Sequence, residues 1–437
     1  MQVVILAGGK GTRLSQYTKE IPKPLINVCG KTILEYQIEN LKKYGLSDII
    51  ISLGYLGEQI RNYFKDGYEL GVNISYIEEK DLLGTGGALS LLKSKINEDF
   101  ILLFGDILLN INWRRFIKFH IEKGGIGSCI VHPNNHPYDS DVIVCNKDAS
   151  INKILYKNQE RGYYKNIVKS GVHIFSKRVL DYIEENKKQD LEKDVLINLL
   201  KKNEKIYCYK TTEYIKDMGT VNRLRQISYD IISNVINQKA LYNKQKCVFL
   251  DRDGSINVYK DLLCTIDDFE LEYRVSESVK RLNSHGYLVI VVTNQPVIAR
   301  NLCTFEELEQ INNKMETLLG RDGAYIDDLY FCPHHPDSGY EGENKKYKMK
   351  CKCRKPGTLL LNNAIDKYNI DIKNSYMIGD TTVDIKTGEN IGCSTILLRT
   401  GLAGKDNKYD VNPTHVADNL YEVVNLILND VKADDNI

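Results

Sequence analysis

The sequence predicts an α/β protein with two Rossmann-like domains. Its 437 residues exceed what one compact core usually accommodates. Short apolar segments alternate with segments of helical periodicity along most of the chain, which is typical of sheets with mainly parallel strands. This alternation starts twice, at residues 2–6 and again at Cys247, and each starting strand runs into glycine and charged residues.

The first domain is predicted to span residues 1–225. The segment 32–45, TILEYQIENLKKYG, has helical periodicity and a terminal glycine. Buried strands are expected at residues 2–6, 48–54, 73–79 and 100–106. The pattern continues to residues 217–219, and residues 226–246 are interpreted as a closing helix and linker.

The second domain is predicted to span residues 247–430. Apolar strands are expected in the segments CVFLD, YLVIVVTNQ, SYMIGD and STILL. Amphipathic helices are expected between them, at residues 275–286 and 305–320. Because ligands of such sheets bind at the carboxyl ends of the strands, functional residues are expected there in both domains.

Composition restricts the partners and the compartment. Positive and negative charges nearly cancel, with 59 Lys and Arg against 58 Asp and Glu, which favours small-molecule substrates over nucleic acid. No segment resembles a signal peptide or approaches 18 consecutive apolar residues, so we expect no membrane span. Most of the 11 cysteines are scattered singly, as in a reducing compartment, and we expect a cytoplasmic protein. The oligomeric state stays open, and a homo-oligomer is compatible with the sequence.

The segment LAGGKGTRL, followed by IPKPL, predicts a phosphate site after the first strand. Its glycines let backbone N–H groups approach a triphosphate, while Arg13 and Lys23 supply positive charge. Asp106 ends the strand FILLFGD, and Asp217 offers a second carboxylate for Mg²⁺. A glycine-rich turn alone is often structural. The ordered set of glycines, cations and carboxylates instead favours nucleotidyl transfer, with Arg13 and Lys23 as catalytic cations.

These motifs resemble those of the sugar-phosphate nucleotidyltransferases, which open with L-A-G-G-x-G-T-R-L and carry a later P-K-P. The resemblance covers about residues 1–225 and implies a mixed sheet of the GT-A-like type. The nucleotide-binding residues that it implies are Leu6, Ala7, Gly8, Gly9, Gly11, Thr12, Arg13, Lys23, Gly84, Thr85, Gly87 and Asp106. It further implies Mg²⁺ on Asp106 and Asp217, and a sugar side formed by Gly171, Glu192 and Lys193. Where the family often carries Glu-Lys-Pro, this chain has LYKNQE, so Lys157 is not assigned to the sugar.

The segment FLDRDGSIN places Asp251 and Asp253 two residues apart after an apolar strand. Two carboxylates at this spacing can divide nucleophilic attack on phosphorus from general acid–base catalysis. Their mutual repulsion predicts Mg²⁺ and a third carboxylate, which the segment MIGDTTVD supplies as Asp380. The predicted contacts of the phosphoryl group are Thr293, Asn294 and Lys355. An isolated D-x-D is more often an acidic loop, but four strand-end motifs in this order make that interpretation poor.

The segment 332–356, CPHHPDSGYEGENKKYKMKCKCRKP, is too polar to order itself by burial. Two close pairs of metal-ligating residues have the spacing of a closed, tetrahedral zinc site. The candidate ligands are Cys332, His334, Cys351 and Cys353; His335 could replace His334, although C-x-H matches better. Structural zinc contributes on the order of 10 kcal/mol in small peptides, enough to fold this loop and fix Arg354 and Lys355 at the mouth of the site. The alternative is a flexible lysine-rich insertion with chance cysteines.

The order of these motifs resembles the haloacid-dehalogenase-type (HAD-type) phosphatases over about residues 246–430. The resemblance implies Asp251 as nucleophile, Asp253 as acid and base, and Mg²⁺ held with Asp380. Within that superfamily, DRDG, TNQ, CPHHP and CRKP are similar to the heptose-1,7-bisphosphate phosphatases, with histidinol-phosphate phosphatases as near relatives. The long segment between the zinc ligand pairs favours the heptose enzymes, in which this loop contacts substrate. Departures are Ser255, where threonine is usual, and TNQPVIAR, where Ser-Gly tends to follow Gln.

Together the two resemblances predict consecutive reactions on D-glycero-D-manno-heptose phosphates. Removal of the 7-phosphate from the 1,7-bisphosphate would supply heptose 1-phosphate, and the first domain resembles heptose 1-phosphate guanylyltransferases, which implies GTP and a GDP-heptose for surface glycans. One alternative keeps both enzymes on other substrates, hexose 1-phosphate beside histidinol phosphate or another sugar phosphate. A second is a sugar-nucleotide sensor without catalysis, which the complete set of carboxylates disfavours.

Overall fold

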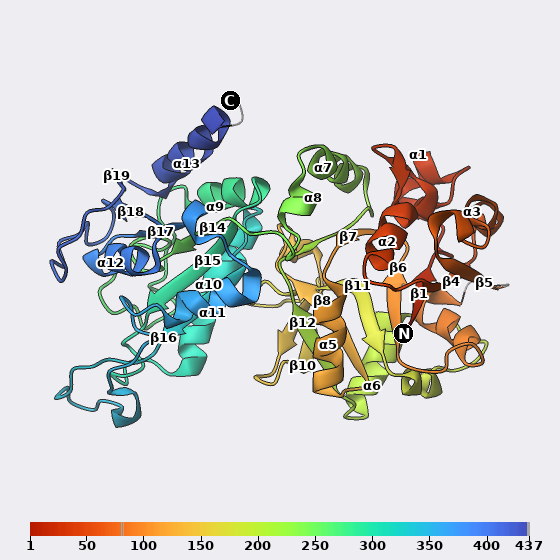
Figure 1. Ribbon diagram of the computed structural model, residues 1–437. Helices are drawn as coiled ribbons and strands as arrows, with labels where there is room; N and C mark the ends of the chain where they lie inside the picture. The colour runs from red at the N-terminus through yellow and green to blue at the C-terminus, as the bar shows by residue number, and fades with distance from the viewer. Residues whose placement is uncertain (80, 82, 435–437) are drawn as a thin grey trace. The chain divides into compact units, whose positions relative to one another are not determined.

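The structure is a computed structural model that describes residues 1–79, 81 and 83–434 (Figure 1). The chain divides into two compact units. The first comprises Met1–Val131, Ile143–Ile154 and Lys169–Ala240; the second comprises His132–Val142, Leu155–Val168 and Leu241–Ile437. Each unit contains its own sheet and helices, so the predicted α/β class with two Rossmann-like domains is confirmed.

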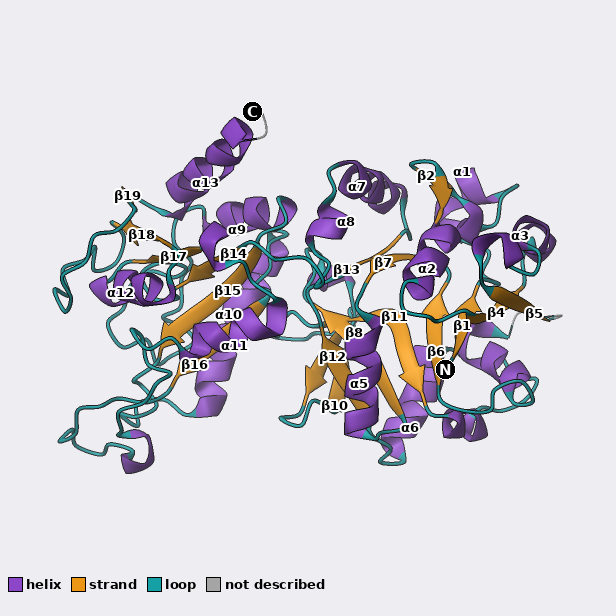
Figure 2. Ribbon diagram, in the orientation of Figure 1, coloured by secondary structure: helices purple, strands orange, loops and turns teal. Residues whose placement is uncertain are grey.

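A mixed, nine-stranded sheet forms the centre of the first unit (Figure 2). Its strands are β1 (Gln2–Leu6), β4 (Asp48–Leu53), β5 (Asn73–Glu78), β6 (Phe100–Phe104), β8 (Gly127–His132), β9 (Val142–Cys145), β10 (Ile151–Leu155), β11 (Val168–Phe175) and β12 (Ile206–Lys210). They follow the order β10-β9-β11-β6-β1-β4-β5, and β8 pairs with both β11 and β12. The prediction of a mixed sheet is therefore confirmed.

The central strands determine which loops meet at the edge of this sheet. β1 is parallel to both β4 and β6, and Leu6 is paired with Phe104. The glycine loop after β1 and the Gly105-Asp106 turn after β6 therefore begin side by side. A short antiparallel pair, β7 (Ile107–Asn110) with β13 (Tyr214–Asp217), places Asp217 opposite Ile107 at the same edge.

Helices cover this sheet and supply its core. They are α1 (Ser15–Thr18), α2 (Ile33–Lys42), α3 (Gly57–Phe64), α4 (Gly84–Gly87), α5 (Trp113–Lys123), α6 (Ile197–Lys201), α7 (Val221–Ile232) and α8 (Val235–Gln238). The predicted helix at 32–45 is α2, whose first turn is closed by a capping box between Thr32 and Glu35. Apolar side chains of α2 and α5 pack on β1, β4 and β6, with Trp113 fully buried.

The second unit is built on a parallel sheet of six strands in the order β16-β15-β14-β17-β18-β19. The strands are β14 (Cys247–Leu250), β15 (Leu288–Asn294), β16 (Asp328–Cys332), β17 (Tyr376–Gly379), β18 (Ser394–Leu398) and β19 (His415–Ala417). The helices are α9 (Val275–Ser284), α10 (Phe305–Arg321), α11 (Leu359–Tyr368), α12 (Thr382–Ile391) and α13 (Leu420–Asp434). The predicted parallel sheet is confirmed.

Alternate residues of the central strands pack on opposite faces of this sheet. Val248 and Leu250 of β14 belong to one apolar cluster together with residues of α9, α10 and α13. Cys247 and Phe249 belong to another, with residues of α11. Both faces are therefore covered, as expected for parallel strands that read as continuous apolar runs. Among the described residues, no helix is long and apolar enough to cross a membrane.

Candidate active sites

The loop after β1 borders a cavity, and close packing together with a hydrogen bond holds its conformation. A Cβ on Gly8 would lie 2.8 Å from the Glu79 carboxylate and 3.3 Å from the backbone nitrogen of Gly54, so a larger residue there would displace Glu79 and crowd the Gly54 backbone. Gly11 has a φ of +61°, and its carbonyl accepts a hydrogen bond from the Thr18 hydroxyl at 3.1 Å. The glycines are thus required by close packing and by a left-handed turn.

This loop borders a cavity of about 440 Å³ in the first unit. Most of the sequence-predicted nucleotide residues line it: Leu6, Ala7, Gly8, Gly9, Gly11, Thr12, Arg13, Lys23, Gly84, Thr85 and Asp106. Gly87 is not among the lining residues; it is buried against the Lys187 carbonyl, which a Cβ would approach to 2.4 Å. Sequence reasoning missed Glu79, Lys188 and Gly219, which also line the cavity but lie outside the recognised motifs.

The two carboxylates predicted to hold Mg²⁺ in this unit lie on neighbouring chain segments. The backbone N–H of Met218 donates to the carbonyl of Asp106 at 3.0 Å, which keeps Asp217 beside Asp106. Asp106 forms an ion pair with Lys23, and both Asp217 oxygens accept from Arg223, at 2.7 and 2.8 Å. Burial would raise the pKa of Asp217, but Arg223, the Gly219 N–H and Lys23 outweigh it and lower the pKa. Each carboxylate therefore already has a cationic partner. Arg223 was not predicted from the sequence, because it belongs to no recognised motif.

The predicted sugar-side residues lie next to the same walls. A Cβ on Gly171 would collide with Phe104, which lines the cavity. Glu192 forms an ion pair with Lys169, whereas Lys193 is exposed. Lys157, which was left unassigned, is 43% exposed and pairs with Asp139 at 2.8 Å.

The second site lies at the carboxyl edge of the parallel sheet. Leu250 pairs with Val291 on one side and Ile378 on the other, so Asp251 and Asp380 leave adjacent strands. They meet Asp384 of α12, and one oxygen from each of the three carboxylates lies within 4.8 Å of the others. The Lys355 ammonium is 2.9 Å from Asp251 Oδ1 and 2.6 Å from Asp384 Oδ1. The site gathers three buried carboxylates around one buried lysine.

The cluster contains more acidic than basic groups, three carboxylates and one lysine. Burial raises the pKa of Asp251 to about 6, although the Lys355 ammonium opposes the rise. Burial and the neighbouring carboxylates of Asp251 and Asp384 raise the pKa of Asp380 to about 8. Asp380 Oδ1 is buried without a hydrogen-bond partner within the described structure, while Oδ2 accepts from the Leu402 N–H at 2.7 Å. An unpartnered oxygen amid three carboxylates fits an oxygen-ligated cation such as Mg²⁺.

Asp253 was expected among the metal ligands, and its carboxylate does not join this group. It accepts hydrogen bonds from Arg252, from Asn257 at 3.1 Å and from Gln295 at 2.7 Å. The buried Arg252 thus holds the Asp253 carboxylate in an ion pair outside the three-carboxylate group. Asp384 instead completes the cluster. The available signal for it was its place in the same segment MIGDTTVD, where Asp384 is the N3 residue of the capping box that opens α12.

Two predicted phosphoryl contacts have partners of their own. Asn294 holds the backbone of Lys355 from both sides: its Oδ1 accepts from the Lys355 N–H at 3.0 Å, and its Nδ2 donates to the Lys355 carbonyl at 3.2 Å. The Thr293 hydroxyl accepts from Gln295 Nε2 at 3.0 Å. Asn294 thus positions the lysine that enters the carboxylate cluster.

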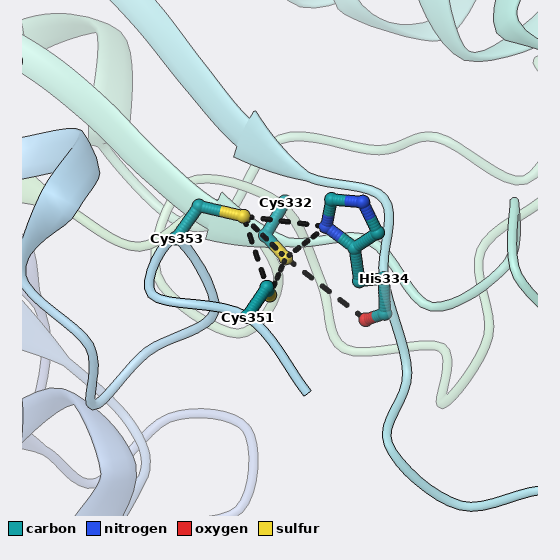
Figure 3. A group of neighbouring side chains, drawn as sticks. All are labelled: Cys332, His334, Cys351 and Cys353. Atoms are coloured by element: carbon teal, nitrogen blue, oxygen red, sulfur yellow. Dashed lines mark hydrogen bonds between the residues drawn. The ribbon is translucent and has the colours of Figure 1, made fainter. Parts of the chain in front are cut away.

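The four predicted zinc ligands converge in one group (Figure 3). Cys353 Sγ lies 3.3 Å from Cys351 Sγ, 3.4 Å from Cys332 Sγ and 3.3 Å from His334 Nδ1. These separations are close to, and for the sulfur pairs somewhat shorter than, the edges of about 3.3–3.8 Å expected for a tetrahedron around zinc bonded at about 2.0–2.3 Å. Nδ1 of His335 instead accepts from the Asp337 N–H at 3.2 Å, so His334 is the histidine that fits. Arg354 Nη1 donates to the His334 carbonyl at 3.0 Å and ties the group to Lys355.

A family model described as nucleotidyl transferase matches residues 2–234, which is more than half of the chain. The chain belongs to the nucleotidyl transferase family. A second model, described as HAD-hydrolase-like, matches residues 352–423. The predicted fusion of a nucleotidyltransferase with a HAD-type phosphatase domain is thereby confirmed.

Curated relatives match each part separately. A D-glycero-beta-D-manno-heptose-1,7-bisphosphate 7-phosphatase of Haemophilus ducreyi is 41% identical over 137 residues, 31% of this chain and 72% of that protein. A UTP–glucose-1-phosphate uridylyltransferase of Synechocystis is 30% identical over 54% of this chain and 64% of its own length. The catalytic subunit beta of mannose-1-phosphate guanylyltransferase of Drosophila melanogaster is 31% identical over 50% of this chain and 59% of its own. The chain thus spans less than two thirds of both sugar-nucleotide relatives.

Among solved structures, HddC from Yersinia pseudotuberculosis complexed with GMP-PN is 26% identical. The match covers 53% of this chain and 99% of that one, with a TM-score of 0.47.

Proposed function

We propose that this chain is a bifunctional enzyme that makes GDP-heptose in two steps. The second unit removes the 7-phosphate of D-glycero-D-manno-heptose 1,7-bisphosphate, and the first transfers GMP from GTP to the resulting heptose 1-phosphate. The observation that carries the proposal is the 41% identity to a heptose-bisphosphate 7-phosphatase within a nucleotidyl transferase chain, because that phosphatase's product would be a sugar 1-phosphate. In this proposal the transferase occupies residues 1–225, the phosphatase residues 247–430, and residues 226–246 connect them.

In the phosphatase step, Asp251 attacks phosphorus and the bond from phosphorus to O7 of the sugar breaks. Asp253, whose side chain is 21% exposed beside the buried Arg252, gives a proton to O7. Water then cleaves the acyl phosphate on Asp251, with Asp253 taking its proton, and inorganic phosphate leaves. Lys355, Thr293 and Arg354 hold the phosphate ester, and Asn294 keeps Lys355 in place.

In the transfer step, an oxygen of the sugar 1-phosphate attacks the α-phosphorus of the nucleotide and pyrophosphate leaves. The backbone of the glycine loop together with Arg13 and Lys23 binds the triphosphate and stabilises the developing charge. Gly84 and Thr85 line the same cavity. Glu192 and Gly171 border the sugar side.

Both steps are proposed to use Mg²⁺, which would be held by Asp251, Asp380 and Asp384 in the second unit and by Asp106 and Asp217 in the first. When bound, the ion neutralises phosphate charge. Zn²⁺ on Cys332, His334, Cys351 and Cys353 is proposed to be structural, because four protein ligands leave no open position. Reduced thiolates and a supply of nucleoside triphosphate both agree with a cytoplasmic location.

The alternative to this proposal concerns the base and the sugar. The two sugar-nucleotide relatives differ in both, since one is a glucose uridylyltransferase and the other a mannose guanylyltransferase. The alternative is therefore a hexose 1-phosphate transferase joined to a histidinol-phosphate or other sugar phosphatase.

Separate assays of the two half-reactions test this proposal. Phosphate release is measured from heptose 1,7-bisphosphate, fructose 1,6-bisphosphate and histidinol phosphate, and pyrophosphate release from each nucleoside triphosphate with heptose, mannose or glucose 1-phosphate. We expect the highest kcat/KM for the heptose bisphosphate, and for GTP with heptose 1-phosphate. Preference for histidinol phosphate, or for UTP with glucose 1-phosphate, would establish the alternative.

A further inference from the structure

A buried lysine on β11 stands out because the proposed reaction does not yet use it. The Lys169 side chain is 4% exposed and forms an ion pair with Glu192, whose side chain is 33% exposed. Behind Lys169 lies the fully buried His173, whose Nε2 is 3.4 Å from the ammonium. The three side chains form a row from the core of the first unit to its surface, and the carboxylate is the outermost group.

His173, the innermost of the three side chains, can accept a hydrogen bond from the Lys169 ammonium. Burial, and then the charge of Lys169, lower the pKa of His173 well below its usual value, so the imidazole is neutral. Because Nε2 faces an ammonium that can only donate, the ring proton lies on Nδ1, which has no partner in the described part of the chain. His173 is also stacked on Phe175, with ring centroids 5.3 Å apart. The histidine therefore fixes the ammonium from behind without adding a second positive charge.

The row ends beside the nucleotide cavity. β11 is antiparallel to β6, with Val172 opposite Leu103, so Lys169 lies near the carboxyl end of β6, where Gly105 and Asp106 line the cavity. The segment that carries Glu192 is held to another cavity wall, because the Leu191 N–H donates to the Thr85 hydroxyl at 2.9 Å. The ion pair thus joins two walls of the cavity.

A stabilising role is a poor explanation for this pair. Removing an ammonium from water costs several kcal/mol, and the attraction to one partly exposed carboxylate does little more than offset that cost. What the arrangement does provide is a carboxylate whose direction is fixed by a buried lysine. Such a carboxylate would repel a phosphate, but it accepts two hydrogen bonds from hydroxyl groups.

We propose that Lys169 is a positioning residue that orients the Glu192 carboxylate to accept hydrogen bonds from the hydroxyl groups of the sugar 1-phosphate. The inference rests on the proposed transferase activity and adds a residue that determines recognition of the sugar. The triphosphate is proposed to bind to the glycine loop, Arg13 and Lys23, none of which contacts Lys169, so KM for the nucleotide should not depend on Lys169.

Steady-state kinetics of the full chain separate the two substrates. Lys169→Met removes the ammonium but keeps the length of the side chain, and Glu192→Gln removes the acceptor charge. Both variants should raise KM for the sugar 1-phosphate about tenfold or more, with KM for GTP within about twofold, as expected when one charge-assisted hydrogen bond is lost. Lys169→Arg should recover most of the affinity. The control is Lys157→Met, an exposed lysine that pairs with Asp139 and is not among the residues that line the cavity, which should leave both KM values unchanged.

A second measurement distinguishes positioning from a general loss of structure. Monodeoxy analogues of the best sugar 1-phosphate identify the hydroxyl group whose removal raises KM most in the wild type. In Lys169→Met and in Glu192→Gln, removal of that same hydroxyl should cost less than twofold further. If the deoxy penalty is as large in both variants as in the wild type, or if both KM values rise together, the proposal is wrong. Failure of the proposed transferase activity can be told apart from failure of the Lys169 proposal. If the wild-type chain turns over no sugar 1-phosphate, the transferase assignment itself is wrong.

Discussion

The two candidate sites arrange positive charge in opposite ways. In the first unit, Asp106 already pairs with Lys23, and Asp217 with Arg223, while Arg13 lines the same cavity. In the second unit, three carboxylates surround Lys355, and one oxygen of Asp380 has no partner in the described structure. In the first site each of the two carboxylates has a cationic partner. In the second site three carboxylates share one lysine, so positive charge is lacking.

This difference shows what each site is built to receive. A cavity lined by a glycine loop together with Arg13, Lys23 and Lys188 attracts a polyanion, and Mg²⁺ would enter together with the triphosphate. A cluster of buried carboxylates attracts a cation before any substrate arrives. The two units should therefore respond independently to substitutions, metals and pH.

The strongest test of that independence is Asp251→Asn. Removal of the nucleophile should lower phosphate release by about 10⁴-fold, because the acyl phosphate cannot form. Nucleotidyl transfer, measured as pyrophosphate release, should stay within twofold of the wild type. Asp366→Asn, at an exposed position of the same unit, serves as the control. Parallel loss of both activities would contradict independent sites.

Arg13→Ala should produce the reverse pattern. Loss of a cation that stabilises the triphosphate should reduce nucleotidyl transfer about 10²- to 10³-fold, as for other single electrostatic contacts in active sites. Phosphate release should be unaffected, and Arg178→Ala, at an exposed position of the 3-10 helix Lys177–Tyr182 in the first unit, should change neither rate. A drop in phosphatase activity would mean that the units are coupled.

Cys351→Ser tests whether the zinc group belongs to the second unit alone. Zinc measured by atomic spectroscopy should fall well below one ion per chain, and phosphatase activity should fall about 10- to 100-fold as Arg354 and Lys355 lose their support. Cys393→Ser, a cysteine outside the group, should retain full zinc. Undiminished zinc in Cys351→Ser would refute the ligand assignment.

Magnesium alone should stabilise the second unit, and more at pH 8 than at pH 6. The pKa of Asp380 is raised to about 8 in the folded chain from an ordinary 3.8. The protonated carboxyl therefore stabilises the metal-free fold fully below about pH 4, and this contribution is lost as pH rises through 8. Mg²⁺ replaces the proton, so its effect on Tm should grow over the same interval, at about 2–4 °C per kcal/mol. In Asp380→Asn the pH dependence of the Mg²⁺ effect should shrink to the part that Asp251 contributes, whose pKa is raised to about 6. An equal Mg²⁺ effect at both pH values in the wild type would contradict the cluster.

The sequence predicted the strand ends well because both sheets are built from continuous apolar runs. Asp106, Asp251 and Asp380 each follow such a run directly, so their approximate location required only the alternation of strands and helices. The zinc ligands could also be predicted from the sequence, because two close pairs of cysteine and histidine residues at this spacing are typical of a tetrahedral zinc site.

The partners of these residues could not be predicted in the same way. Lys169 pairs with a carboxylate 23 residues away, and Arg223 with one six residues away across the end of β13 and the start of α7; no sequence motif marks either pairing. Asp253 and Asn294 were placed at the correct edge, but hydrogen bonds to Arg252 and to the Lys355 backbone decide where they point. Strand order and side-chain direction arise from packing, which one sequence does not reveal.

The central claim is that the product of the second unit is the acceptor of the first. The most direct measurement is mass-spectrometric identification of the sugar nucleotide after incubation with heptose 1,7-bisphosphate, GTP and Mg²⁺. Wild type should form GDP-heptose with one phosphate and one pyrophosphate released per product, and Asp251→Asn should form it only when heptose 1-phosphate is supplied instead. A GDP-heptose that still carries the 7-phosphate, or no sugar nucleotide from either heptose phosphate, would contradict the account.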